Sequence, residues 1–334
     1  MNAQLIADTA AVVDGIRPLN PQRDLRQVAD LIEEAFAGEL EAGGLAALRD
    51  MRLLSHMGPL VGLMARSDPL VEDVLGGFVW VSGGQVVGNV TLQRTDSAGS
   101  RWQIANVAVA KSHRGQGIGR ALMEAALERI AERRGSWAVL QVRADNAVAL
   151  QLYQSLGFEV VTHEVVMQLE RVRQVPEVQE PPAELRPYHH SEWQARYELE
   201  CAAHTSLDQW WRPVRPHQFW ESTESRLAAR LWELLGRNRV RRWVVPGRHG
   251  LQAWLSVDAR RWDGIHRLQI TVHPAHRGEL EEGLTAFALR FLAAYPRWPV
   301  RIEQHGHHPE LVAALQRWGF ATVRHHLAMR RRVD

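Results

Sequence analysis

Three glycines spaced two residues apart are the first feature of this chain whose residue types and spacing can do chemistry. They are Gly115, Gly117 and Gly119, in the stretch HRGQGIGRALMEAAL. An apolar segment precedes them, and a run with the spacing of an amphipathic helix begins at Ile118. Glycine permits positive φ and close approach of a ligand, and the first N–H groups of a helix lack helical partners. The pattern therefore predicts an anion site, most naturally for phosphate.

Two familiar phosphate-binding motifs do not fit this stretch. A P-loop needs Gly-x-x-x-x-Gly-Lys-Ser/Thr, and Arg120-Ala121 do not supply its last two residues. A dinucleotide fingerprint needs Gly-x-Gly-x-x-Gly, but Arg120 stands where its last glycine belongs. The preceding strand also ends five residues before Gly115, too early for that tight turn. A different kind of phosphate ligand is therefore expected.

A second motif follows downstream in VRADNAVALQLYQSLGFEVV, which holds Asn146, Tyr153 and Gly157-Phe158. Together with Arg114-x-x-Gly117-x-Gly119 after a strand, it resembles the GNAT acyltransferases. The likeness covers most of residues 10–170 and is closest to the branch that acetylates the N-termini of ribosomal proteins. The second half of the chain resembles the same fold only weakly.

The resemblance implies acetyl-CoA as the cofactor and acyl donor, with no metal. The pyrophosphate of CoA is expected on the loop, mainly against backbone amides, and the pantetheine arm along the free edge of the preceding strand. Amides of that strand would also polarise the thioester carbonyl. By the same likeness, Asn146 should hydrogen-bond the cofactor. The implied contact residues are Val107, Ala108, Val109, Arg114, Gly115, Gln116, Gly117, Ile118, Gly119, Arg120 and Asn146.

Tyr153 is the catalytic residue that the resemblance implies. It would be the general acid for the departing thiolate, because a phenol with a pKa of about 10 stays protonated at neutral pH. The general base is missing from its expected place, where relatives carry a glutamate and this chain carries Gln141. Possible substitutes are Glu33, Glu34, Asp96 or a chain of waters, and none of them is assigned.

Three pairs of markers recur in the same order at a nearly constant offset of 162 to 169 residues. Ile16–Leu19 matches Leu185–Tyr188, VAVAKSHRG at 107–115 matches ITVHPAHRG at 270–278, and Gly157-Phe158 matches Gly319-Phe320. Such a series indicates an internal duplication. We therefore predict an acyltransferase domain at 1–170, a Pro- and Glu-rich linker at 171–183 and a degenerate copy at 184–334. Each domain is expected to be α+β, with a mixed, mostly antiparallel sheet flanked by helices.

The second copy has lost the residues on which the first depends. Leu280 and Glu282 replace Gly117 and Gly119, and the segment 279–282 carries three glutamates that would repel a pyrophosphate. At the positions that match Tyr153 and Asn146 stand Leu315 and His308. The second domain is therefore predicted to keep the fold without binding CoA.

Tryptophan and histidine gather in the second half of the chain. Ten of the 13 tryptophans lie from Trp193 onward, where they could line a ligand site or pack the core and a domain interface. His305, His307 and His308 suggest a metal, but no further ligands follow at suitable spacing, so no metal site is predicted.

Composition limits the surroundings in which the chain can work. It has 334 residues, one cysteine and no apolar run long enough to span a membrane, and its N-terminal segment lacks the basic start of a signal peptide. These features predict a cytoplasmic protein. The sequence pI is about 9.0, but the formal charge is only +2 and the basic residues are scattered, so nucleic-acid binding is not predicted.

The leading hypothesis is an N-acetyltransferase with its active site in the first domain. Its acceptor would be a small-molecule amine or a peptide N-terminus, and the protein would be a monomer or homodimer. Two hypotheses from other classes remain: a non-catalytic acyl-CoA-binding sensor, and an interaction protein whose Trp-rich half docks a partner.

Overall fold

The computed structural model describes residues 14–37, 42–56, 76–96, 99–172, 182, 184–220, 238–262 and 264–333. Most of the linker expected at 171–183 lies outside this part of the chain. Contacts divide the chain into two compact units. The first unit comprises Met1–Gln141, Gln151–Glu159 and Met329–Asp334, and the second comprises Val142–Leu150 and Val160–Ala328.

The first unit is built around five consecutive strands with helices on both faces. In chain order the elements of this half are β1 (Gly15–Pro18), α1 (Pro21–Ala35), α2 (Ala42–His56), β2 (Gly76–Ser82), β3 (Gln85–Arg94), β4 (Arg101–Val109), the 3₁₀ turn η1 (Lys111–His113), α5 (Ile118–Glu132), β5 (Trp137–Arg143) and α6 (Ala147–Ser155). The end of β5 and the start of α6 lie in the segment Val142–Leu150, which groups with the second unit. The strands lie in the order β1-β2-β3-β4-β5. All neighbours are antiparallel except β4 and β5, which are parallel.

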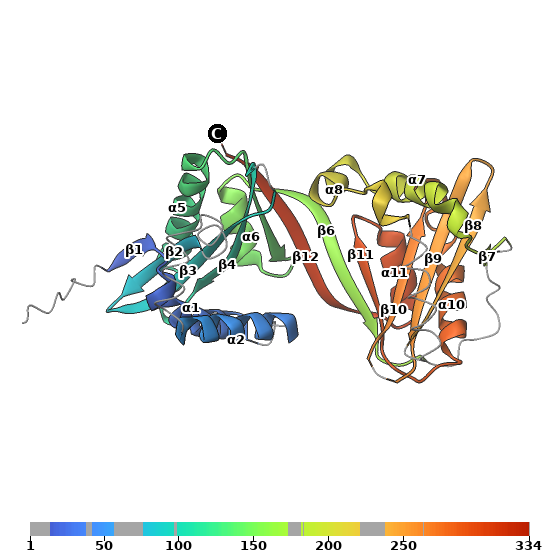
Figure 1. The fold of residues 1–334 in the computed structure, drawn as a ribbon, viewed down its shortest axis with the longest axis horizontal. Helices are drawn as coiled ribbons and strands as arrows, with labels where there is room; N and C mark the ends of the chain where they lie inside the picture. The colour runs from blue at the N-terminus through green and yellow to red at the C-terminus, as the bar shows by residue number, and fades with distance from the viewer. Residues whose placement is uncertain are drawn as a thin grey trace, which may run out of the picture. The chain divides into compact units, whose positions relative to one another are not determined.

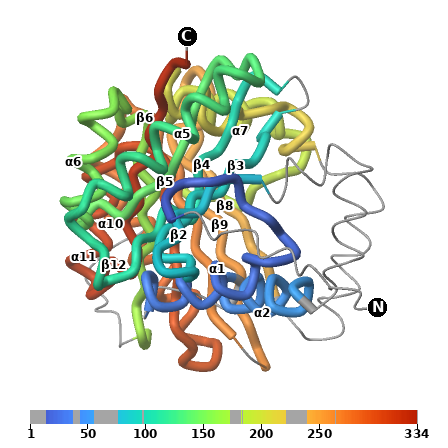
Figure 2. The backbone as a smooth tube through the Cα atoms, turned by 90° about the vertical axis from the view of Figure 1, so that its left-hand side faces the viewer, coloured from blue at the N-terminus to red at the C-terminus, as the bar shows by residue number. Residues whose placement is uncertain are grey.

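Helix α1 shows how the sequence fixes one layer of this unit. Asn20 caps it by accepting the N–H of Gln22 at 3.0 Å, and Pro21 is compatible with the first helical position. The apolar face of α1 is buried with strand residues and Leu48 of α2. Helices α1 and α2 lie side by side on one face of the strands, and α5 covers the other (Figures 1 and 2).

The second unit repeats this order of elements. They are β7 (Arg186–Pro187), η2 (His190–Glu192), α7 (Trp193–Ala203), α8 (Ser206–Trp211), η3 (Pro216–Gln218), β8 (Asn238–Gly247), β9 (Gly250–Arg260), β10 (His266–Val272), η4 (Pro274–His276), α10 (Glu281–Leu292), β11 (Val300–His305), α11 (Pro309–Arg317) and β12 (Ala321–Arg332). Strands β7 to β11 follow one another in the sheet, and again a single neighbouring pair, β10 and β11, is parallel. The α+β fold class and its duplication, both predicted from the sequence, are confirmed.

Aromatic side chains of the second half contribute directly to its core. Trp243 packs edge-on against Phe287 and Phe291, with ring centroids 5.0 and 5.1 Å away. Trp254 is 3% exposed and lies in a smaller cluster with Leu199 and Val244. Both tryptophans therefore contribute to core packing, which was one of the two roles open from the sequence.

Strand β6 (Glu159–Leu169) joins the sheet of the second unit. It pairs with β11 in an antiparallel register that runs from Leu169 opposite Val300 to Glu164 opposite His305. Residues 160–169, placed in the first domain by the sequence, thus group with the second unit. Conversely, the chain from Met329 onward groups with the first unit. The division into domains at 1–170 and 184–334 therefore stays a prediction.

The end of the chain is anchored in the first unit by specific contacts. Arg330 Nε donates to Glu159 Oε1 at 2.7 Å, and its guanidinium lies 4.7 Å from the centroid of the Trp137 ring. The N–H of Val333 donates to the carbonyl of Ser136 at 3.0 Å. These contacts explain why the segment from Met329 onward groups with the first unit.

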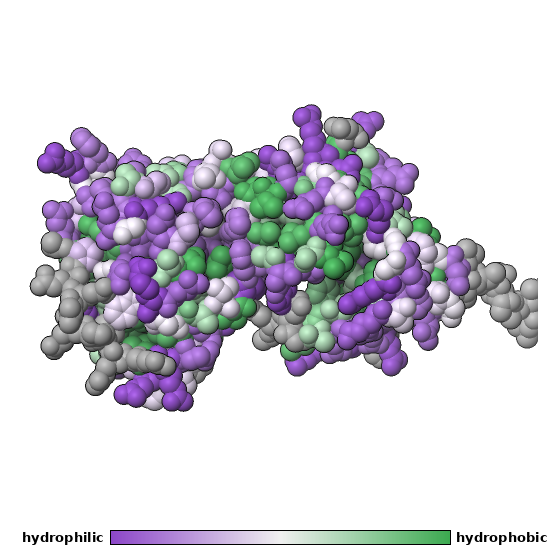
Figure 3. Space-filling view, turned by 180° about the vertical axis from the view of Figure 1, so that it is seen from behind, coloured by the Kyte–Doolittle hydropathy of each residue, from purple (hydrophilic) through white to green (hydrophobic). Residues whose placement is uncertain are grey.

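Figure 3 shows a face on which hydrophilic side chains predominate, with patches of hydrophobic ones among them. In the described ranges, no helix is both long and apolar enough to cross a membrane.

Candidate cofactor and catalytic site

The candidate site of the first unit begins where two parallel strands separate. Strands β4 and β5 pair only from Arg101 opposite Trp137 to Gln103 opposite Val139. Strand β4 continues to Val109, so its last residues present an edge that β5 no longer covers. Val107, Ala108 and Val109, the residues predicted to bind the pantetheine arm, all lie in this last part of β4.

The glycine loop joins β4 to α5 and leaves the start of the helix open. Gly115 and Gly117 have φ values of 77° and 81°, and Gly117 is the N-cap residue of α5. A Cβ atom at either position would meet nothing within 4 Å, so positive φ rather than crowding calls for glycine here. Within the described residues no side chain caps α5, so its first N–H groups are available to an anion.

Most of the residues predicted to contact the cofactor in this loop are exposed to solvent. Arg114, Gln116 and Arg120 are exposed, whereas Ile118 is buried beneath the loop. Arg114 Nε donates to the carbonyl of Val109 at 3.1 Å, which ties the loop to the end of β4. Positively charged side chains thus flank the open helix terminus.

Helix α6 packs against the same loop. A Cβ atom built on Gly119 would lie 3.6 Å from Leu152 Cδ2 and 3.9 Å from Val109 Cγ2. Arg120 donates to Ser155 Oγ at 2.6 Å. The structure therefore brings together the end of β4, the glycine loop and the part of α6 that carries Tyr153.

Tyr153 is held in an apolar environment. Its side chain is 6% exposed, and its ring centroid lies 6.0 Å from that of Phe158. Burial raises the pKa of Tyr153 to about 12, because the phenolate would lose its hydration. The phenol is therefore fully protonated at neutral pH and has a proton to donate to a hydrogen-bond acceptor there.

Asn146 has a local structural role. Its Oδ1 accepts the N–H of Ala149 at 3.1 Å and so caps α6. It lies in the segment Val142–Leu150, which groups with the second unit. In the part of the chain that the structure describes, no hydrogen bond joins Asn146 to the glycine loop, so its role toward a cofactor stays a prediction.

The carboxylates considered as a general base are mostly engaged elsewhere. Glu33 pairs with Arg52. Burial would raise the pKa of Asp96, but hydrogen bonds from Ser100 and from the N–H of Arg101 lower it below its ordinary value. Only Glu34 touches the loop region, where its Oε1 accepts the N–H of Lys111 at 3.3 Å. The base stays unassigned.

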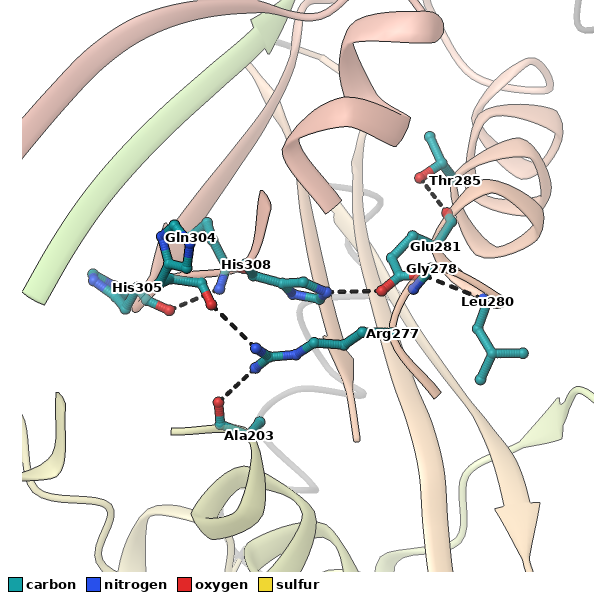
Figure 4. A network of polar contacts seen from close by, with 10 residues as sticks. Ala203, Arg277, Gly278, Leu280, Glu281, Thr285, Gln304, His305 and His308 are labelled. Carbon is teal, nitrogen blue, oxygen red and sulfur yellow. Dashed lines mark hydrogen bonds and ion pairs between the residues drawn. The ribbon is translucent and has the colours of Figure 1, made fainter. Parts of the chain in front are cut away.

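The matching loop of the second unit is occupied by one of its own side chains. Glu281, at the position of Ile118, is 1% exposed. Its Oε2 accepts the N–H groups of Gly278 at 2.9 Å and Leu280 at 3.2 Å, and its Oε1 lies 2.8 Å from His308 Nε2 (Figure 4). A carboxylate of the chain itself thus binds the backbone N–H groups of this loop, at the position where the first unit carries Ile118.

The surrounding charges keep Glu281 ionised. Burial would raise its pKa, but hydrogen bonds from His308 and from backbone N–H groups lower that pKa below its ordinary value. Arg277 next to it donates to the carbonyls of Ala203 at 2.7 Å and His307 at 3.1 Å (Figure 4). The loop of the second unit is therefore fixed by its own contacts.

A pocket of about 320 Å³ lies in the second unit between the separating ends of β10 and β11. Its lining includes Trp254 and Arg196, and the Arg196 guanidinium lies 3.8 Å from the centroid of the Trp254 ring. In the described residues, no group of three or more His, Cys, Asp or Glu side chains could hold a metal ion. The pocket lies at the place in the second unit that matches the separating ends of β4 and β5 in the first unit.

Comparisons with known proteins agree with this geometry. Residues 52–158 match the family model described as "Acetyltransferase (GNAT) family". Over these residues the chain is similar to the GNAT acetyltransferases. The match spans the glycine loop and Tyr153, so it covers the part of the GNAT fold in which the candidate site lies.

Relatives of the chain include two differently named acetyltransferases. A mycothiol acetyltransferase from Kocuria rhizophila is 33% identical over 146 residues, which are 43% of this chain and 45% of that protein. A [ribosomal protein bS18]-alanine N-acetyltransferase from Escherichia coli is 44% identical over 57 residues, which are 17% of this chain and 38% of that protein. The chain thus spans less than half the length of these two relatives.

A solved GNAT structure extends the likeness of fold to both halves. The GCN5-related N-acetyltransferase from Sphaerobacter thermophilus aligns over 96% of this chain and 95% of its own, with a TM-score of 0.54 and 16% identity. At that identity the likeness concerns the fold alone. The likeness of fold extends over both units of the chain.

Sequence reasoning missed two groups of residues. The buried carboxylate of Glu281 was counted only as one of three repelling charges, although its position matches the buried Ile118 and so called for a partner. The polar residues Asn89 and Thr91 were passed over inside an apolar strand. Their spacing of two residues, which places both on one face of β3, was the available signal.

Proposed function

We propose that this protein is an N-acetyltransferase that transfers an acetyl group from acetyl-CoA to a primary amine in its first unit. One observation carries the proposal: an uncapped helix terminus with a glycine loop follows directly on a strand that has parted from its parallel neighbour. The family match and the names of the relatives support this reaction class.

The cofactor would occupy the loop and the free strand edge. The N–H groups of residues 114–120 at the start of α5 would bind the diphosphate, with help from the exposed Arg114 and Arg120. The amide groups of the pantetheine arm would pair with the backbone of Val107–Val109. Acetyl-CoA supplies the activated thioester, and the chain binds it and orients its carbonyl.

The reaction would proceed by direct attack. The lone pair of a neutral amine forms the C–N bond, an oxyanion develops on the former carbonyl oxygen, and collapse of this intermediate breaks the C–S bond. With a pKa of about 12, Tyr153 is a weaker acid than a thiol of pKa about 8.5. It therefore stabilises the departing thiolate by a hydrogen bond, and the net proton on the CoA thiol comes from the attacking amine.

The acceptor would be a peptide N-terminus or a small amine. One relative named above acetylates the alanine of a ribosomal protein, as its name states, and the other is named for mycothiol. The second unit would bind no CoA, because Glu281 fills its anion position. The single cysteine of the chain supports a reducing, cytoplasmic location. The protein would work as a monomer or homodimer.

The test is an assay of free CoA with a thiol reagent, using acetyl-CoA and a panel of peptides and small amines. Release of CoA that depends on particular amines is expected. Tyr153→Phe should lower kcat by about 10²-fold or more, and leave the Kd for CoA nearly unchanged. Tight binding of CoA without transfer to any amine would instead support the non-catalytic sensor.

A further inference from the structure

Strand β4 contains a β-bulge in the middle of the candidate site. Its register with β3 runs from Ala105 opposite Thr91 directly to Ala108 opposite Asn89. Two residues of β4, Asn106 and Val107, therefore lie opposite one residue of β3, Val90. Asn106 has a φ of 51°, in the left-handed region that asparagine tolerates better than most residues. Bulges of this kind change the direction of backbone groups near active sites.

The side chain of Asn89 holds this bulge. Asn89 is completely buried, and its Nδ2 donates to the carbonyl oxygen of Asn106 at 2.9 Å. Thr91 Oγ1 lies 3.4 Å both from that Nδ2 and from Asn106 Nδ2. In the described part of the chain, Asn89 Oδ1 has no hydrogen-bond partner. A buried acceptor without a partner costs stability, so an apolar residue would serve a purely structural purpose better here.

Peptide geometry turns this contact into a direction for the next amide. In a trans peptide the C=O of Asn106 and the N–H of Val107 point in opposite directions, and the chain has no cis peptide bond in the described residues. Asn89 draws the carbonyl toward β3. The N–H of Val107 must then point away from β3, toward the edge that β5 leaves uncovered after Gln103.

We propose that Asn89 is a positioning residue for acetyl transfer. By fixing the Asn106 carbonyl, it aims the Val107 N–H at the carbonyl oxygen of the bound thioester, where negative charge develops as the amine adds. Its hydrogen bond also polarises the shared peptide group and so strengthens donation by that N–H. This inference rests on the proposed function, since it concerns the same site.

The decisive experiment measures the carbonyl group directly. The infrared band of acetyl-CoA labelled with ¹³C at the carbonyl is recorded free, on the wild-type protein and on Asn89→Leu. A strong donor moves this band to lower frequency on the wild type. In Asn89→Leu, which has a similar volume and no donor, the band should return toward its free position. Transfer should lose about 10-fold to 100-fold in kcat, and CoA, which lacks the acetyl carbonyl, should bind as before.

Two further variants separate positioning from stability. Asn89→Asp keeps the size and polarity of the side chain but removes the donor while ionised, so it should reproduce the loss if Asn89→Leu does not fold. Asn20→Ala removes the cap of α1 in the same unit. It should reduce thermal stability and leave the carbonyl band and kcat unchanged.

Two results would overturn the inference. One is an unchanged band and kcat in an Asn89 variant that still binds CoA like the wild type. The other is loss of the band shift in Asn20→Ala as well. If the wild type transfers acetyl groups and the Asn89 variants leave the band in place, only this inference fails. If the wild type shifts the band but acetylates no amine, the proposed function fails and the role of Asn89 in polarising the carbonyl stands.

Discussion

Removing the Glu281 carboxylate should strongly destabilise the second unit. Glu281 and His308 are 1% and 4% exposed, and their polar atoms lie 2.8 Å apart. Breaking a buried pair by removing one partner costs about 3–5 kcal/mol, because the other polar group stays buried without it. We expect Glu281→Ala to lose free energy of unfolding in this range, which changes the unfolding equilibrium by about 10²-fold to 4 × 10³-fold.

Urea unfolding followed by tryptophan fluorescence is the suitable assay. Ten of the 13 tryptophans lie from Trp193 onward, so the signal reports mainly on the second unit. The matched control is Glu282→Ala on the same helix. Glu282 pairs with Arg317 at 2.7 Å on the surface, and loss of such a pair costs at most about 1 kcal/mol.

A double-mutant cycle isolates the contact between the two side chains. Glu281→Ala, His308→Ala and the double variant should give a coupling free energy of about 1–3 kcal/mol, since the residues touch. Additive effects of the two substitutions would refute the reasoning. A loss from Glu281→Ala no larger than that from Glu282→Ala would refute it equally.

Two further predictions concern acid stability and cofactor binding. Folding lowers the pKa of Glu281, so its contribution to the free energy of unfolding is complete above the ordinary carboxyl pKa of 4.5. This contribution is lost as the pH falls through the pKa of the folded state. The urea midpoints of wild type and Glu281→Gln should therefore converge in acid, and a constant gap between them would contradict this. Gly117→Asp and Gly117→Ala both place a side chain at a residue with positive φ, but only the aspartate repels the diphosphate. Calorimetry should therefore show that CoA binds about 10-fold or more weakly to Gly117→Asp than to Gly117→Ala. Equal affinities would argue against a diphosphate on this loop.

The fold was predictable where local sequence patterns decide it. Gly115 and Gly117 need positive φ, and the helix that starts at Ile118 follows from apolar spacing, so loop and helix were expected together. The duplication was visible because HRG recurs with the same strand and helix around it. Both features depend on residues close together in the chain.

Features that depend on distant pairing could not be predicted in the same way. The apolar pattern of β6 is compatible with many neighbouring strands, and the sequence of residues 160–169 does not show that β11 is the one with which it pairs. The partner of Glu281 lies 27 residues away at His308, and the partner of Asn89 lies 17 residues away on another strand. Such contacts arise from tertiary structure. The hydrophobic periods of two residues in a strand and 3.6 residues in a helix do not specify them.

The path of the last strand has a consequence for how the chain is made. The segment from Met329 onward belongs to the first unit, yet it is synthesised after the residues of the second unit. The N-terminal half therefore gains the contacts of Arg330 and Val333 only after the second unit has been made, and its folding has to wait for sequence far away in the chain. A fragment that stops at the linker would lack these contacts, so the first half should be prepared within the full chain.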